Sequence, residues 1–250
     1  ARLRLSEAQL QKVVVATPSV LSCSFESNLE PSLAKLQARL RLSEAQLQKV
    51  VVTTPSVLGF SFESNVEPSL AKLQARLGLS EAQLQKVVVM LPSVLGYSFE
   101  SNIELSPAKL QARLGLSEAQ LQKVVVAQPS VLGLNFESNI EPSLAKLQLR
   151  LGLSEAQLQK VVVALPPVLG YSFESNIEPK LDFLQGEVGL SLDAMRAKVL
   201  TCPAVLGYSL ARRYIPRLEA CREVGADPIL VVNRVPMTDE RFYASIGRER

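Results

Sequence analysis

Lysine and arginine recur at fixed places in the chain, 37 residues apart, and such a regular series of positive charges is suited to binding a polyanion. One series is Lys35, Lys72, Lys109 and Lys146, and a second is Arg39, Arg76, Arg113 and Arg150. A third series is Lys12, Lys49, Lys86, Lys123 and Lys160. Evenly spaced cations can neutralise the phosphates of a nucleic acid. We take the first two series, together with Lys123 of the third, as candidate nucleic-acid-binding residues.

Each series also has a plainer interpretation. The acidic edge of one helix could pair with the basic edge of the next, which would give a ladder of surface salt bridges worth about 0–1 kcal/mol each. The third series could be a solvated polar strip along one face of a helix. The sequence leaves these alternatives open.

Other kinds of chemistry are excluded by residue type. The chain contains no histidine, and its three cysteines, Cys23, Cys202 and Cys221, lack any metal-ligand spacing. Zinc sites, Ser-His-Asp triads and Cys-His dyads cannot form without these residues. No glycine-rich phosphate loop or paired-carboxylate pocket is visible. We therefore expect a protein that is not an enzyme, binds no cofactor or metal, and keeps its thiols free.

Composition indicates a folded protein. The 250 residues are 47% apolar, and the formal net charge is only +3, too small an excess to indicate a nucleic-acid or membrane surface by itself. Charged residues and prolines interrupt the apolar runs well before the ~18 residues that a membrane span needs, so we expect no membrane partner. Residues 1–5 repeat the letters of residues 38–42. This suggests that the chain starts inside a repeat and that an upstream segment has been removed.

The 37-residue period defines the elements that must position the basic series. The predicted repeats are 5–41, 42–78, 79–115, 116–152, 153–189 and 190–225, followed by a C-terminal cap at 226–250. Within the first repeat, apolar spacing predicts a helix over 7–16 that begins with a capping box of Ser6 and Gln9. Pro18 opens a very short second helix. The third helix begins somewhere between residues 24 and 30 and runs to Leu40.

Glycines are expected to end the second and third helices in the left-handed conformation. Those after the second helix are Gly59, Gly96, Gly133, Gly170 and Gly207, and those after the third are Gly78, Gly115, Gly152 and Gly189. A single repeat cannot close a core, so the repeats must stack on one another. The predicted fold is all-α, one α-solenoid superhelix over residues 1–250 built from three-helix repeats.

Two places vary between the otherwise similar repeats, the pair Ala16-Thr17 with its equivalents and a single later position. The occupants of the later position are Cys23, Phe60, Tyr97, Leu134, Tyr171 and Tyr208. Aromatic side chains there could stack on bases in a repeat that reads one base at a time. An aromatic next to a glycine is also typical of a packed core.

The repeat resembles the mitochondrial transcription termination factor (mTERF) family of the plant or green-algal type. The resemblance rests on Leu116-Ser117, on Pro129-Ser130-Val131-Leu132, on Phe136-Glu137-Ser138-Asn139-Ile140-Glu141-Pro142 and on the later Arg213-Tyr214-Ile215-Pro216-Arg217-Leu218. It implies a left-handed α-solenoid whose basic concave groove holds double-stranded nucleic acid in an organelle, a mitochondrion or alternatively a chloroplast. It also implies phosphate contacts near the second proline, at Arg212, Arg213, Arg217 and Lys180. The earlier repeats depart from this pattern because they carry Ser32, Ser69 or Ser143 at the place of Lys180.

The function expected from this resemblance is double-stranded DNA binding through backbone phosphates, by a monomer that terminates or regulates organellar transcription. Two alternatives come from other classes. One is a protein-interaction or designed helical-repeat scaffold whose charges only keep the surface soluble, and the other is an RNA-binding repeat protein.

Overall fold

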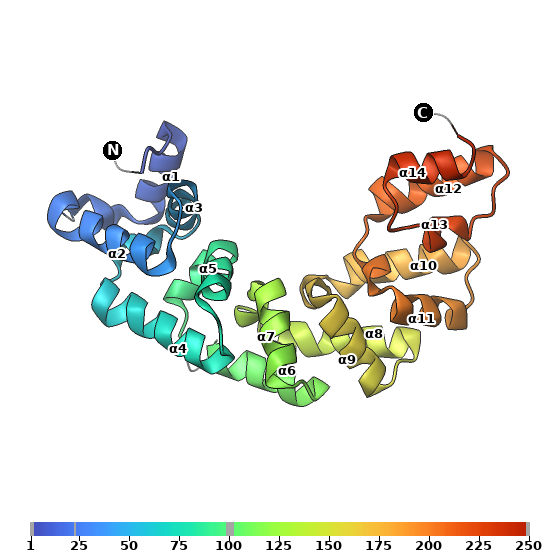
Figure 1. Ribbon diagram of the computed structural model, residues 1–250, viewed down its shortest axis with the longest axis horizontal. Coiled ribbons are helices and arrows are strands. Elements are labelled where there is room, and N and C mark those ends of the chain that lie inside the picture. The colour runs from blue at the N-terminus through green and yellow to red at the C-terminus, as the bar shows by residue number, and fades with distance from the viewer. Residues whose placement is uncertain (1–2, 23, 99–102, 249–250) are drawn as a thin grey trace. The chain divides into compact units, whose positions relative to one another are not determined.

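The computed structural model describes residues 3–22, 24–98 and 103–248, and across these ranges the chain is helical without a strand (Figure 1). Each repeat begins with a first helix. These are α1 (Glu7–Ala16), α3 (Glu44–Thr53), α5 (Glu81–Met90), α7 (Glu118–Ala127), α9 (Glu155–Ala164) and α11 (Leu192–Thr201). Each repeat ends with a third helix. These are α2 (Glu30–Leu40), α4 (Glu67–Leu77), α6 (Leu105–Leu114), α8 (Glu141–Leu151), α10 (Glu178–Gly186) and α12 (Ile215–Glu223). The all-α, repeat-based prediction is confirmed.

The first helices begin where the capping signal predicts. The Ser6 hydroxyl accepts a hydrogen bond from the Gln9 backbone N–H, and the Gln9 side chain accepts one from the Ser6 N–H. The same reciprocal pair recurs in α3, α5, α7 and α9. This arrangement satisfies backbone donors that the first turn of a helix leaves unpaired.

A π-helical turn directly precedes the third helix and shows where that helix begins. In the first repeat it spans Phe25–Leu29, and α2 follows directly from Glu30. Equivalent turns lie at Phe62–Val66, Phe136–Ile140, Phe173–Ile177 and Leu210–Tyr214. Pro31 therefore falls in the first turn of α2, where the missing N–H has no intrahelical partner to lose.

The predicted glycine stops are correct for three of the third helices. Gly78, Gly115 and Gly152 each have φ of 61° at the C-cap. Gly189 also has a positive φ, of 80°, but α10 already ends at Gly186. Glycine is a poor helix former, so Gly186 ends this helix earlier than the prediction.

The prediction for the glycines after the second helix is wrong. The second element is a short 3-10 helix. It lies at Pro18–Ser22, Pro55–Gly59, Pro92–Gly96, Pro129–Leu132, Pro166–Gly170 and Pro203–Leu206. Its glycine keeps a negative φ, for example −104° at Gly133. The glycine instead leaves room for a ring from the preceding repeat, because a Cβ on Gly133 would lie 2.4 Å from the Tyr97 hydroxyl.

The chain forms two compact units, residues 1–135 and 136–250. In the first unit, α1, α3 and α5 each pack against the next first helix along the chain, and the third helices lie along the other side (Figure 1). The apolar faces of both kinds of helix are buried, as Leu36 and Val50 illustrate. That residues 1–250 form a single solenoid stays a prediction.

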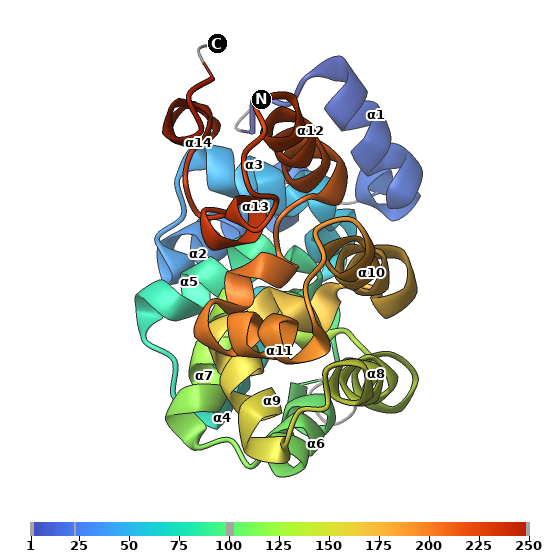
Figure 2. The ribbon, with the colours of Figure 1, turned by 90° about the vertical axis from the view of Figure 1, so that its right-hand side faces the viewer.

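The second unit ends in two short helices that cover the last repeat. They are α13 (Leu230–Asn233) and α14 (Asp239–Ser245), and both contact α12 (Figures 1 and 2). Val231, Val235 and Phe242 are buried there. These helices lie within the predicted C-terminal cap.

Candidate nucleic-acid interface

The lysines of the third helices lie beside glutamates of the following repeat. The Lys35 ammonium donates to the Glu63 carboxylate, and Lys146 donates to Glu174 in the same way. In each pair the hydrogen bond from lysine lowers the carboxyl pKa below its ordinary value of 4.5. Both partners in each pair are largely exposed, so each pair adds little to stability.

The arginines of the third helices reach further along the stack. The Arg39 guanidinium donates to Glu67 at 3.0 Å in the second repeat and to Glu81 at 2.5 Å in the third. The hydrogen bond to Glu67 is the main cause that raises the Arg39 pKa above its ordinary value. Glu81 is the first residue of α5, where the helix dipole also favours a negative charge.

Two more arginines of the series follow the same pattern. Arg150 donates to Asp182 at 3.0 Å, and Arg76 lies 3.6 Å from Glu118. None of Lys72, Lys109 and Arg113 is free of an interaction partner. The salt-bridge ladder, the plainer of the two interpretations, is therefore present. Whether these residues also contact nucleic acid stays a prediction.

The position that holds serine in the first four repeats, and Lys180 and Arg217 in the next two, has a different role. In the third repeat the Ser106 hydroxyl donates to the Leu134 carbonyl, 3.0 Å away in the next repeat. In the fifth repeat the Lys180 ammonium donates to the Leu206 carbonyl at 2.6 Å and to Asn176. Lys180 is only 5% exposed, and this burial lowers its pKa. In these two repeats the residue at this position therefore donates a hydrogen bond to the backbone of the next repeat.

Arg217 performs this task at the end of the chain. Its guanidinium donates to the carbonyls of Arg234, Val235 and Met237, and to the Asp239 carboxylate at 2.7 Å. It also lies over the Phe242 ring, 4.5 Å from the centroid. The sequence placed Arg217 on an exposed basic edge, and this placement is wrong because the residue is 0% exposed.

The two arginines before Tyr214 differ from each other. Arg213 donates to the Val235 carbonyl at 3.1 Å and lies over the Tyr208 ring. The Arg212 side chain is exposed and has no partner among residues 3–22, 24–98 and 103–248. Of the basic residues that the resemblance singled out, Arg212 is therefore the one whose guanidinium is available to a ligand.

A second set of available cations lies on the first helices. We call it the lysine row, and it comprises Lys12, Lys49, Lys86, Lys123 and Lys160. All five are exposed, and none has an ion pair or hydrogen bond with the part of the chain that the structure describes. Sequence reasoning included only Lys123 among its candidates. The sequence did show the whole row, but a solvated polar strip explained it equally well, and for that reason the other four lysines were left out.

The aromatic side chains at the variable position are half-buried. Phe60 and Tyr97 line an open cleft of about 310 Å³ together with Ser69 and Lys72. The Phe60 ring also lies 3.2 Å from where a Cβ would stand on Gly96. These rings therefore pack between repeats, and Cys23 of the same series lies outside the described residues.

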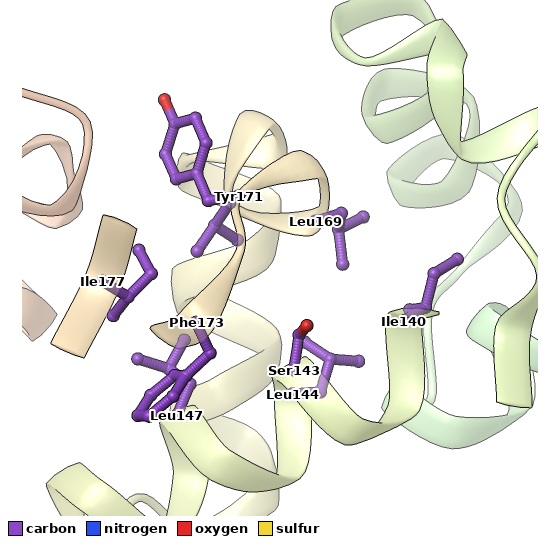
Figure 3. A pocket seen from close by; sticks show the side chains of 9 residues that line it. Ile140, Ser143, Leu144, Leu147, Leu169, Tyr171, Phe173 and Ile177 are labelled. Atoms are coloured by element: carbon purple, nitrogen blue, oxygen red, sulfur yellow. The ribbon is translucent and has the colours of Figure 1, made fainter. Parts of the chain in front are cut away.

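Two small, mainly apolar cavities lie between neighbouring repeats. The one between α8 and the following repeat is about 10 Å³, close to the space of a single water. Figure 3 shows Phe173 beside Leu147 there, with the Tyr171 ring directed away from them. No group of three or more potential metal ligands occurs among the residues searched. The described helices also include none that is both long and apolar enough to cross a membrane.

Comparison with known protein families identifies the repeat. The sequence model of the mTERF family matches residues 1–104 and 72–243, which together cover most of the chain. A search of the curated proteins finds no match.

Proposed function

Because the chain belongs to the mTERF family, which places it among nucleic-acid-binding helical-repeat proteins of organellar transcription, we propose that it binds double-stranded DNA through backbone phosphates. Its role in this proposal is transcription termination or regulation in the mitochondrion. The proposal assigns it binding and no reaction, since a chain without histidine lacks the Ser-His-Asp and Cys-His arrangements of nucleophilic catalysis.

The observation that carries the proposal is the lysine row. Lys12, Lys49, Lys86 and Lys123 stand at the same place on successive first helices of the first unit. A flexible, fully hydrated ammonium suits contact with a phosphate, and each phosphate that a lysine neutralises releases condensed counterions. No ion pair with another described residue competes for these four charges.

The charge balance indicates a grip on the backbone of modest strength. Most of the third-helix cations are neutralised by glutamate or aspartate of another repeat, and the net charge is only +3. Lysine contacts to phosphate fix position but carry little sequence information. We therefore expect weak sequence preference from this surface.

The test compares two variants with equal charge change. One replaces the four lysines of the row in the first unit, Lys12, Lys49, Lys86 and Lys123, by glutamine. The control replaces Lys35, Lys72, Lys109 and Lys146 by glutamine. Fluorescence anisotropy measures binding to random duplex DNA, single-stranded DNA and RNA between ~50 and ~200 mM salt.

We expect the parent to prefer the duplex. In the row variant the slope of log affinity against log salt concentration should be smaller by about four units, so that between ~50 and ~200 mM salt its affinity falls about a hundredfold less than that of the parent. The control should lose much less. A larger loss in the control would locate binding on the third helices and contradict the proposal. Preference for RNA or single strands would favour an RNA-binding function instead.

A further inference from the structure

The fourth repeat exposes a leucine where the repeats before it have alanine. Leu149 lies near the end of α8 and is 85% exposed. The equivalent residues are Ala38, Ala75 and Ala112, so the repeat does not require a large apolar side chain at this place. Since the side chain is exposed and its equivalents are small, packing within the stack does not account for Leu149.

Leu149 lines an open groove of about 610 Å³ between α8 and the segment that begins the third helix of the fifth repeat. The other lining residues are Lys146, Arg150, Phe173, Glu174 and Glu178. The α8 wall of the groove carries the cations, and the opposite wall carries the carboxylates. Each wall also contributes one apolar side chain.

The arginine and one glutamate of this groove have polar groups that the chain leaves unused. In the first unit Arg39 donates to Glu67 through Nε. The equivalent Arg150 instead donates to Asp182 through Nη2, and its Nε and Nη1 have no partner among the described residues. Asp182 stands where the earlier repeats have alanine. The carboxylate of Glu178, the equivalent of Glu67, consequently makes no ion pair with the part of the chain that the structure describes.

A second copy of the chain fits this groove, because each copy carries both halves of the contact. When a two-fold axis relates two copies, the same surface patch of each faces the other, and a cation on one wall can meet a carboxylate on the opposite wall of its partner. We propose that two copies of the chain associate through the groove around Leu149, with the Arg150 guanidinium of each copy paired with Glu178 of the other. The two leucines then shield each other from water.

This inference is independent of the proposed function, because the lysine row lies on the first helices and the groove lies on the third. The contact is small. Stable interfaces bury about 1,200–2,000 Å² in total, and a groove centred on one exposed leucine buries less. We therefore expect a weak, reversible dimer with a Kd on the order of 50 µM.

Sedimentation velocity of the full chain between ~5 and ~300 µM measures the association. Leu149→Ala introduces the residue of the first three repeats, so circular dichroism should be unchanged. Its Kd should rise at least tenfold, because each dimer no longer buries two leucine side chains. Leu192→Ala is the matched control, since Leu192 is also exposed in the second unit but lies outside the groove. This control should change the Kd less than twofold.

Two charge reversals test the pairing across the axis. Glu178→Arg alone and Arg150→Glu alone each place like charges opposite each other twice, so each variant should stay monomeric. An equimolar mixture of the two variants restores two pairs of opposite charge and should form dimers about as well as the parent. A parent that stays monomeric at ~300 µM would overturn the proposal. Association of Leu149→Ala as strong as that of the parent, or a mixture of the reversed variants that stays monomeric, would overturn it as well.

Discussion

Replacement of Arg217 by methionine tests whether this arginine holds the C-terminal helices or serves a ligand. Methionine keeps much of the apolar stem but removes the hydrogen bonds to three carbonyls and to Asp239. Removing one partner of a buried ion pair costs about 3–5 kcal/mol. The Asp239 side chain is 38% exposed, so water can solvate it in the variant, and we take the lower end, about 3 kcal/mol.

This cost applies to the contact between α12 and the helices α13 and α14. Hydrogen exchange in residues 230–245 reports opening of that contact separately from unfolding of the other repeats. Since about 1.4 kcal/mol corresponds to a tenfold change in an equilibrium, exchange there should accelerate about a hundredfold in Arg217→Met.

Arg212→Met is the matched control, because Arg212 is exposed five residues earlier. Hydrogen exchange in residues 230–245 of this variant should change less than threefold, because substitutions at exposed positions usually change the free energy of unfolding by about 0.5 kcal/mol or less. Equal exchange in Arg217→Met and the parent would refute the structural role assigned to Arg217. Loss of duplex binding in Arg217→Met with unaltered exchange would restore it as a phosphate contact.

Two further predictions concern contacts between repeats. Gly133→Ala should destabilise the protein by about 1 kcal/mol, because the new methyl group displaces the Tyr97 ring. Urea unfolding measures the loss, and Gly59→Ala is the control because a Cβ there would have nothing within 4 Å. Equal stability of the two variants would exclude the ring contact. The Glu174 carboxyl should titrate below its ordinary value of 4.5 by NMR and return toward it in Lys146→Met. Since the folded-state pKa is the lower one, the stabilisation from this pair is complete above about pH 4.5 and is lost as the pH falls through the folded-state pKa; an unshifted midpoint in the parent would show that the pair is absent in solution.

The sequence predicted those features whose causes are local. Ser6 and Gln9 lie only three residues apart in the sequence. Their capping box therefore predicted the residue at which the first helix begins. The partners of Arg39 lie 28 and 42 residues ahead, and finding them requires the register of three stacked repeats. Arg217 was misplaced for the same reason, since its carboxylate partner Asp239 belongs to the irregular last segment, where the repeat offers no template.

Comparison of equivalent residues in stacked repeats distinguishes side chains that packing uses from side chains that are free to bind a ligand. A side chain that stacking uses changes its environment at the end of the stack, as Leu10 does when compared with Leu47. A side chain that stacking does not use keeps the same environment in every repeat.

The lysine row behaves in the second way. Lys12 in the first repeat is exposed, and so are Lys49, Lys86 and Lys123 further along the chain. Four cations of the third helices do not, because each pairs with a carboxylate one or two repeats ahead; they are Lys35, Arg39, Lys146 and Arg150. Packing therefore accounts for the recurrence of Arg39 and its equivalents but not for that of Lys12 and its equivalents, and this difference is the physical reason to look for the ligand on the first helices.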